Sequence, residues 1–365
     1  MSADVSRLRA ALFAGLALSA ASATADAGPS RLSRTMGAVE RANISASLVY
    51  VRDDGGRKQV FTIAADGSGE RALTSGATDH YPADVTRDGA TLAVIGARGA
   101  TEADHVESLE LVDLGTRRAR PTSVSASRLR NPTFSPDGAR IALEADGTLD
   151  GQPKAFRDVF VTDTSGGHVR RLTHDPRGSF EPAFTSDGAS IVFAASDDDG
   201  AELQRVDVAG QGPRARLTHA KGDDFSARPS PDGRRLAFVS ARTGVDRVWL
   251  RDMTAGEPRL VASRGAGEER DPSWSRDGAK LAFTQRTAKG ARVVVWDAGT
   301  DQITALTDGA STDETPSFSP DGQYVAYASG QGGARDVWIS RVDGSARVKV
   351  ARAAADRWRP LWIAR

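Results

Sequence analysis

Residues 132–138 read Pro-Thr-Phe-Ser-Pro-Asp-Gly, and residues 316–322 repeat this stretch almost unchanged as Pro-Ser-Phe-Ser-Pro-Asp-Gly. In each copy the second proline presets φ for a tight turn, and the glycine takes the left-handed conformation that follows. Apolar runs rich in β-branched and aromatic residues come next, such as Tyr-Val-Ala-Tyr at residues 324–327. The stretch therefore predicts the turn of a β-hairpin.

The Asp-Gly pair of this turn recurs along the chain at a regular spacing. It occurs at Asp88, Asp137, Asp187, Asp232, Asp277 and Asp321, and successive aspartates are 49, 50, 45, 45 and 44 residues apart. This period matches the length of a four-stranded β-propeller blade. We expect these aspartates to form turns and not to act as catalytic carboxylates.

The two ends of the sequence predict how the ring closes. Residues 47–74 contain a second, a third and a fourth strand without a first, and residues 359–362 (Arg-Pro-Leu-Trp) supply a first-strand pattern. We therefore expect an all-β propeller of seven four-stranded blades, closed by the C-terminal strand joining the N-terminal blade. A six-bladed ring is the alternative, if one irregular repeat does not form a full blade.

The N-terminal residues have the pattern of an export signal. Arg7 and Arg9 precede an apolar run at residues 10–20, and small residues follow up to Ala27. The run is shorter than the roughly 20 residues that span a bilayer; a short packed helix or an uncleaved anchor is the alternative. We expect a signal peptide at 1–27, a polar arm or linker at 28–46 and the propeller at 47–365.

The composition limits the classes of partner. The 48 basic and 48 acidic side chains cancel, so the chain lacks the positive surface that binds nucleic acid. No cysteine is present, which excludes disulfides and thiolate metal sites. We expect a monomer with no membrane span after the signal is removed.

The repeated Pro-x-Phe-Ser-Pro-Asp-Gly pattern resembles the TolB-type propeller family over roughly residues 47–365. The resemblance implies a non-enzymatic scaffold in the periplasm, or secreted, that binds an envelope or periplasmic protein or peptide through one propeller face. TolB proteins have an additional α/β domain before a six-bladed propeller, whereas this chain has a short arm and counts to seven. The fourth marked repeat, residues 228–233, also lacks the Phe-Ser pair.

Candidate binding residues stand directly before the proline of each first strand. They are polar and differ between repeats, whereas the aromatic residues at fixed repeat positions are expected to pack between blades. Because binding residues of propellers gather in loops at the mouth of the channel, we expect these residues to bind the partner; a merely hydrated mouth is the alternative. They are Tyr81, Asn131, Glu181, Arg228, Asp271, Thr315 and Arg359.

Three histidines support an alternative, enzymatic hypothesis. His80, His174 and His219 lie in connections that lead to a first strand, and three imidazoles can hold a divalent metal. This pattern is similar to the oligogalacturonate lyase family, which implies a metal-dependent enzyme acting on acidic oligosaccharides. Because His174 and His219 directly follow outer strands, we expect no metal site, no cofactor and no catalytic residue.

Two acidic runs are further candidates for a cation site. Residues 197–199 and 223–224 are consecutive aspartates, but neither run has the spacing of a calcium loop. We expect both runs to be exposed turns.

Overall fold

The computed structural model describes residues 34–364 apart from 54, 100, 102–103, 153–155, 211, 255, 262–266, 332 and 351–355. The expected signal peptide and the first part of the expected arm lie outside the described residues. Ser33–Arg365 forms one compact unit, which is almost entirely β-structure. No helix in the described part of the chain has the length and apolar character needed to cross a membrane.

Five sheets of this unit each contain four antiparallel strands. The first sheet is formed by β29 (Asp356–Ala364), β2 (Ala46–Asp53), β3 (Lys58–Ala64) and β4 (Arg71–Ala72). The second contains β5 (Asp79–Val85), β6 (Thr91–Arg98), β7 (Val106–Asp113) and β8 (Arg118–Ala126). The third contains β9 (Leu129–Phe134), β10 (Arg140–Ala145), β11 (Asp158–Asp163) and β12 (Arg170–Arg171).

The fourth and fifth sheets repeat the same order. The fourth contains β13 (Ser179–Phe184), β14 (Ser190–Ser196), β15 (Ala201–Asp207) and β16 (Ala215–Arg216). The fifth contains β17 (Asp224–Pro229), β18 (Arg235–Ser240), β19 (Arg247–Asp252) and β20 (Arg259–Leu260).

The remaining strands form one nine-stranded sheet. It contains β21 (Glu269–Trp274), β22 (Lys280–Arg286), β23 (Ala291–Asp297), β24 (Gln302–Ala305), β25 (Thr312–Phe318), β26 (Tyr324–Gln331), β27 (Ala334–Arg341), β28 (Ala346–Lys349) and β1 (Arg34–Thr35). A single parallel pair, Ala291 with Thr312, joins the antiparallel group β21–β24 to the antiparallel group β25–β28. Among the described residues, separate four-stranded sheets therefore number five rather than the seven or six expected, because this edge contact fuses two groups.

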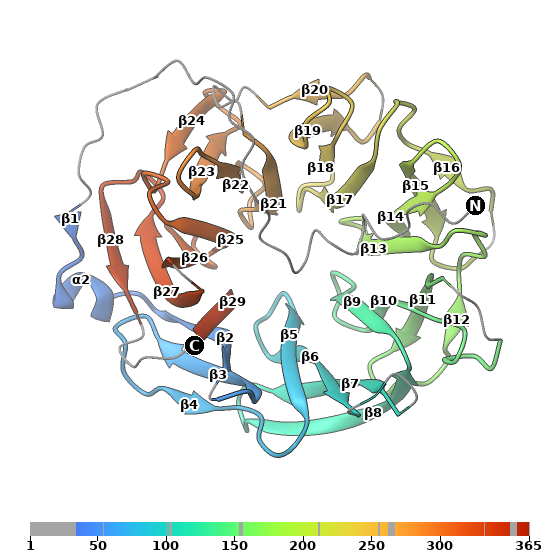
Figure 1. Ribbon diagram of the computed structural model, residues 1–365, viewed down its shortest axis with the longest axis horizontal. Helices are drawn as coiled ribbons and strands as arrows, with labels where there is room; N and C mark the ends of the chain where they lie inside the picture. The colour runs from blue at the N-terminus through green and yellow to red at the C-terminus, as the bar shows by residue number, and fades with distance from the viewer. Residues whose placement is uncertain are drawn as a thin grey trace. The chain divides into compact units, whose positions relative to one another are not determined.

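The sheets are arranged around a common centre, and the first strand of each group lies nearest to that centre (Figure 1). The strands β5, β9, β13, β17, β21, β25 and β29, hereafter the inner strands, contact one another in this order, and β29 contacts both β25 and β5. The last strand, β29, pairs antiparallel with β2, as the first-strand pattern near the C-terminus predicts. The fold is an all-β propeller of four-stranded blades.

The Asp-Gly turns are held by a repeated set of hydrogen bonds. The Ser135 hydroxyl donates to the Asp137 carboxylate, which also accepts the Ala139 N–H at 3.1 Å, while Gly138 has a φ of 71°. Hydroxyl-to-aspartate bonds recur at Asp88, Asp187, Asp232, Asp277 and Asp321. The prediction that these aspartates form turns is confirmed.

The apolar core lies between neighbouring sheets. Phe134 packs with Ile95 and Leu111 of the preceding sheet, and Phe318 packs with Val295 in the same manner. Aromatic residues at this repeat position therefore fill the contacts between blades, as expected from their recurrence.

A threonine in the connection that follows the fourth strand ties that connection to the third strand. In the fourth sheet the buried Thr218 Oγ1 accepts the Leu203 N–H at 2.9 Å and donates to Glu202 at 2.6 Å. The hydrogen bond from a third-strand backbone N–H to the threonine hydroxyl recurs at Thr74, Thr173 and Thr307. This explains why the repeat ends in Leu-Thr in several blades.

Part of the expected arm belongs to the folded unit. Strand β1 pairs in parallel with β28, and it is followed by the short helix α2 (Ala38–Ala42). Met36 and Ile44 are buried at 2% and 3% exposure in the same cluster as residues of β27 and β28. Glu40 forms ion pairs with Arg341 at 3.0 Å and with Arg34 at 2.8 Å. The segment covers the outer edge of β28, which would otherwise offer unpaired backbone groups.

Candidate binding site on the inner strands

Each inner strand contains a register shift at the same stage of its course. In six of these strands one residue at the shift has a left-handed backbone with φ between 48° and 57°: Asn131, Glu181, Ser226, Asp271, Thr315 and Arg359. Such a bulge turns the side chain away from the regular alternation of the strand, and residues other than glycine seldom adopt this φ. The chain therefore presents one side chain per strand from an equivalent backbone position.

Five of the seven sequence candidates occupy this position, and two do not. In β17 Ser226 takes the left-handed conformation, while Arg228 lies two residues later, beyond the shift. In β5 the shift falls between Pro82 and Asp84, so Tyr81 pairs regularly with Ile95. Tyr81 is half-buried, and its desolvation raises the pKa of the phenol.

Two carboxylates near the shift link adjacent inner strands. Asp84 of β5 accepts the Phe134 N–H of β9 at 2.8 Å and the Thr133 hydroxyl at 3.0 Å. Glu181 of β13 accepts the Ser226 N–H of β17 at 2.6 Å. The surrounding protein desolvates both carboxyls and raises the pKa of each. Sequence reasoning missed Asp84, although an acidic residue at this repeat position is found in no other repeat.

Two further candidates are bonded to the second strand of their own sheet. The Asn131 amide donates to Glu144, which also pairs with Arg157 at 2.8 Å. The exposed Asp271 accepts a hydrogen bond from the Thr284 hydroxyl at 3.1 Å. Each bond fixes the direction of its side chain.

Arg228, Arg359 and Thr315 have polar groups without a side-chain partner in the described part of the chain. Arg228 is exposed and donates only to the neighbouring Ala227 carbonyl, at 2.9 Å. Arg359 is half-buried; desolvation lowers the pKa of its guanidinium, with Asp271 acting against the shift and Arg228 and the nearby Arg130 adding to it. The Thr315 hydroxyl is buried and has no hydrogen-bond partner.

The three histidines of the enzymatic hypothesis are not brought together. His80 is buried in β5, with Nδ1 3.1 Å from Gln59 Oε1 and Nε2 3.6 Å from Glu110 Oε2. His174 and His219 are exposed in the connections after β12 and β16, in two other sheets. Across the described residues, no group of three or more His, Cys, Asp or Glu side chains is placed to hold a metal ion.

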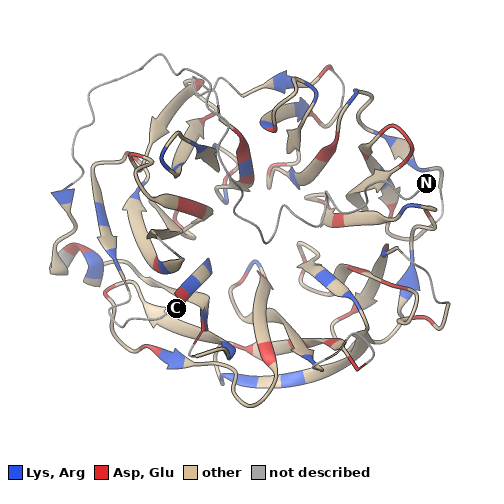
Figure 2. Cartoon of the chain, in the orientation of Figure 1, with Lys and Arg blue, Asp and Glu red and all other residues tan. Residues whose placement is uncertain are grey.

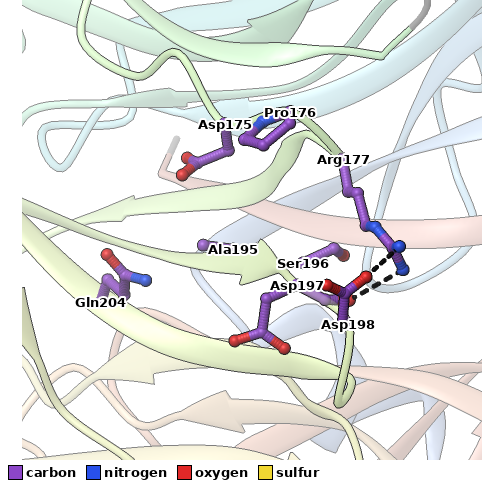
Figure 3. A pocket seen from close by; sticks show the side chains of 8 residues that line it. All are labelled: Asp175, Pro176, Arg177, Ala195, Ser196, Asp197, Asp198 and Gln204. Carbon is purple, nitrogen blue, oxygen red and sulfur yellow. Dashed lines mark hydrogen bonds and ion pairs between the residues drawn. The ribbon is translucent and has the colours of Figure 1, made fainter.

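A pocket of about 170 Å³ lies beside the first acidic run (Figure 3). It is lined by Asp175, Pro176, Arg177, Ala195, Ser196, Asp197, Asp198 and Gln204. Arg214 makes two hydrogen bonds of 2.9 Å to Asp175, and Arg177 pairs with Asp198. Because several of its carboxylates are paired with arginines of the chain itself, this pocket is a weaker candidate site than the inner strands.

The two acidic runs differ in their surroundings. Asp197, Asp198 and Asp199 are exposed, as expected of a turn. Asp224 is instead fully buried and pairs with Arg242 at 2.9 Å, so the expectation of an exposed turn is wrong there. The reason is that Asp224 opens the inner strand β17, where its carboxylate faces the protein interior.

Acidic and basic side chains are intermixed over the sheets, and no sheet carries a single sign of charge (Figure 2). This distribution agrees with the net charge of zero. It gives no support to a phosphate-binding surface.

Comparison with known proteins relates this geometry to a family. The sequence matches the TolB beta propeller domain over residues 181–364, half of the chain. It is 37% identical over 71 residues to the Tol-Pal system protein TolB of Thiobacillus denitrificans, a stretch that covers 20% of this chain and 16% of that protein. The chain thus matches only about one sixth of the length of this relative.

Solved structures share the fold. TolB from Acinetobacter baumannii superposes with a TM-score of 0.59 at 22% identity, covering 92% of this chain and 89% of that one. Oligogalacturonate lyase from Vibrio parahaemolyticus gives a TM-score of 0.62 at 15% identity, covering 85% of this chain and 89% of that one. Such identities show the fold and leave the activity open. Because the family match extends over half of the sequence, the chain belongs to the TolB β-propeller domain family.

Proposed function

We propose that this protein is a non-enzymatic binding scaffold that engages an envelope protein or peptide through one propeller face, using side chains at the register shifts of the inner strands. The observation that carries the proposal is the equivalent backbone position in six inner strands, which presents a different polar side chain in each. Residues that are constant between repeats build turns and core, so residues that vary at a fixed position are free to recognise a partner.

Family membership supports this proposal. The TolB of Thiobacillus denitrificans is described as a Tol-Pal system protein, and this chain shares one segment of it. We propose the periplasm as the location, with residues 1–27 as the export signal, residues 28–46 as an arm and residues 47–365 as the propeller. We also propose that the protein acts as a monomer without a cofactor.

We further propose that the folded unit is a seven-bladed propeller closed by β29. The groups β21–β24 and β25–β28 each have the antiparallel order of a blade, and among the described residues one parallel pair joins them. Seven inner strands contact one another in sequence and return from β29 to β5, which supports this count.

The test compares capture of periplasmic or envelope proteins by the wild-type protein and by the double variant Asp271→Asn, Arg228→Gln. The matched control is Arg234→Gln, which changes an exposed arginine in the turn that follows β17. We expect the double variant to lose a partner that the wild type and the control retain.

Equal capture by all three proteins would overturn the proposal. Bound divalent metal in the purified protein, together with cleavage of oligogalacturonate, would instead establish the enzymatic alternative. Metal analysis and the ultraviolet absorbance of unsaturated sugar products report this outcome.

A further inference from the structure

Two arginines of the inner strands, Arg228 and Arg359, form no ion pair among the described residues, although the carboxylates of Glu181 and Asp84 interact electrostatically with Arg228. On the same strands Arg357 lies 3.5 Å from both Glu70 and Asp336, and Arg270 lies 2.6 Å from Asp246. In the part of the chain that is described, no carboxylate oxygen lies within 4.0 Å of a guanidinium nitrogen of Arg228 or Arg359. A cationic group in a partly desolvated environment is normally paired, so the half-buried Arg359 is incomplete as it stands, whereas Arg228 is exposed.

The charged groups around Arg359 add to its need for a negatively charged partner. Arg228 and Arg130 act on Arg359 as like charges, and Asp271 acts as the opposing charge. Asp271 is bonded to the Thr284 hydroxyl and forms no ion pair with Arg359. An anion placed between the guanidinium groups would relieve their mutual repulsion.

The Thr315 hydroxyl adds a third unused group. Thr315 and Arg359 occupy the equivalent left-handed position in β25 and β29, which are adjacent inner strands. The hydroxyl is buried without a partner, and buried polar groups without a partner are uncommon unless a ligand or water completes them. Both donors therefore leave neighbouring strands at the same level.

We propose that Arg228, Arg359 and the Thr315 hydroxyl bind the carboxylate of a single acidic side chain in a peptide segment of the partner. This inference rests on the proposed scaffold function and specifies its ligand. A guanidinium matches a carboxylate with two parallel hydrogen bonds, and a hydroxyl donates to the same oxygens.

The neighbouring groups favour a peptide over an acidic oligosaccharide. Asp271 is exposed beside the arginines and would repel the further carboxylates that each ring of a polyuronate carries. A peptide presents one carboxylate flanked by neutral backbone N–H groups, and Asp271 can accept hydrogen bonds from these N–H groups.

The test titrates the full-length mature protein with the blocked peptides acetyl-Gly-Glu-Gly-amide and acetyl-Gly-Gln-Gly-amide and with trigalacturonate, following the arginine side-chain NMR signals. We expect the wild-type protein to bind the glutamate peptide. Its affinity for this peptide should fall by about tenfold in Arg359→Gln and in Arg228→Gln, because each variant loses a charge-assisted hydrogen bond. Arg359→Lys should keep part of the affinity, and Arg234→Gln should keep all of it. Thr315→Val should weaken binding to a smaller extent.

Three results would overturn the inference: equal binding of the two peptides, wild-type affinity in both glutamine variants, or tighter binding of trigalacturonate than of the glutamate peptide. Thermal melting of each variant establishes that it is folded, and Arg359→Lys provides the comparison if Arg359→Gln does not fold. Capture of a protein partner by the same preparation is scored separately. Retained capture with no preference for the glutamate peptide would reject the carboxylate site and leave the scaffold function intact.

Discussion

The Asp84 carboxylate accepts a 2.8 Å hydrogen bond from the backbone N–H of Phe134, so a side chain of β5 holds the neighbouring inner strand β9. We expect Asp84→Ala to lower the free energy of unfolding by about 1–3 kcal/mol, because it leaves a buried backbone donor unpaired. Asp84→Asn should lose less, since its amide oxygen can accept the same bond. Urea unfolding of the three proteins measures the difference, and equal stability of Asp84→Ala and wild type would contradict the assigned role.

Glu181 should make stability fall as the pH rises. Burial raises its pKa from the usual 4.5, so the folded state binds the proton more tightly than the unfolded state does. This contribution is complete below pH 4.5 and is lost as the pH rises through the folded-state pKa. Glu181→Gln should therefore be more stable than wild type at pH 7 and equal to it at pH 4. Unfolding free energies across this range test the sign, and a difference independent of pH would count against it.

The turn aspartates should act in the opposite direction. The Ser135 hydroxyl lowers the pKa of Asp137 below its usual 3.8, so the stabilisation is present above pH 3.8 and is lost as the pH falls through the folded-state pKa. Asp137→Ala should cost about 1 kcal/mol near neutral pH, through loss of the bonds to Ser135 and Ala139. Denaturation at pH 7 and at pH 2 checks both parts, and a cost that persists unchanged at pH 2 would refute the charge-dependent share.

Thr218 tests the bond between the third strand and the connection after the fourth. Replacement by valine keeps the shape but leaves the Leu203 N–H without its acceptor and removes one of the hydrogen bonds to the Glu202 carboxylate, at a cost of about 1–3 kcal/mol. Thr243→Val, at an exposed threonine, is the matched control and should change stability little. Thermal unfolding of the pair gives the answer, and similar melting temperatures would exclude a structural role for the Leu-Thr pattern.

The arm segment should contribute to the stability of the propeller. Ile44 is buried at 3% exposure against β27 and β28, so Ile44→Ala should cost about 2–5 kcal/mol. Val245→Ala changes an apolar residue that is 38% exposed and should have little effect. Chemical denaturation compares them, and an unaffected Ile44→Ala protein would mean that the arm is not part of the cooperative unit.

The turns and strands were predictable because their determinants are local. The Asp137–Gly138 pair specifies its turn through its own backbone preferences and through a hydroxyl two residues earlier. The fusion of two sheets was not predictable, because it depends on one contact between Ala291 and Thr312 at the edges of separate hairpins.

The candidate site was predicted in part, because the equivalent residues of the repeats were aligned on the proline of each first strand instead of on the Asp-Gly turn. Taking the residue before each proline selected Arg228, whereas the register is measured from the turn: Ser226 precedes Asp232 by the same interval as Asn131 precedes Asp137. Asp84 escaped notice because its role is a bond to the next strand, Phe134, which no local pattern reveals. The unpaired state of Arg359 likewise depends on what the other strands place around it.

The pairing of β2 with β29 has a consequence for the route by which the chain folds. Val49 and Leu361 are paired although about three hundred residues separate them. The first sheet can therefore be completed only after nearly the whole chain has been synthesised. Closing so long a loop makes the contact late and slow. Until then β2 keeps an open edge that can pair with another molecule, and a nascent chain is most exposed to misassembly at this point. A circular permutant that makes β29 and β2 neighbours in sequence should shorten this vulnerable interval, because the slowest long-range contact becomes a hairpin.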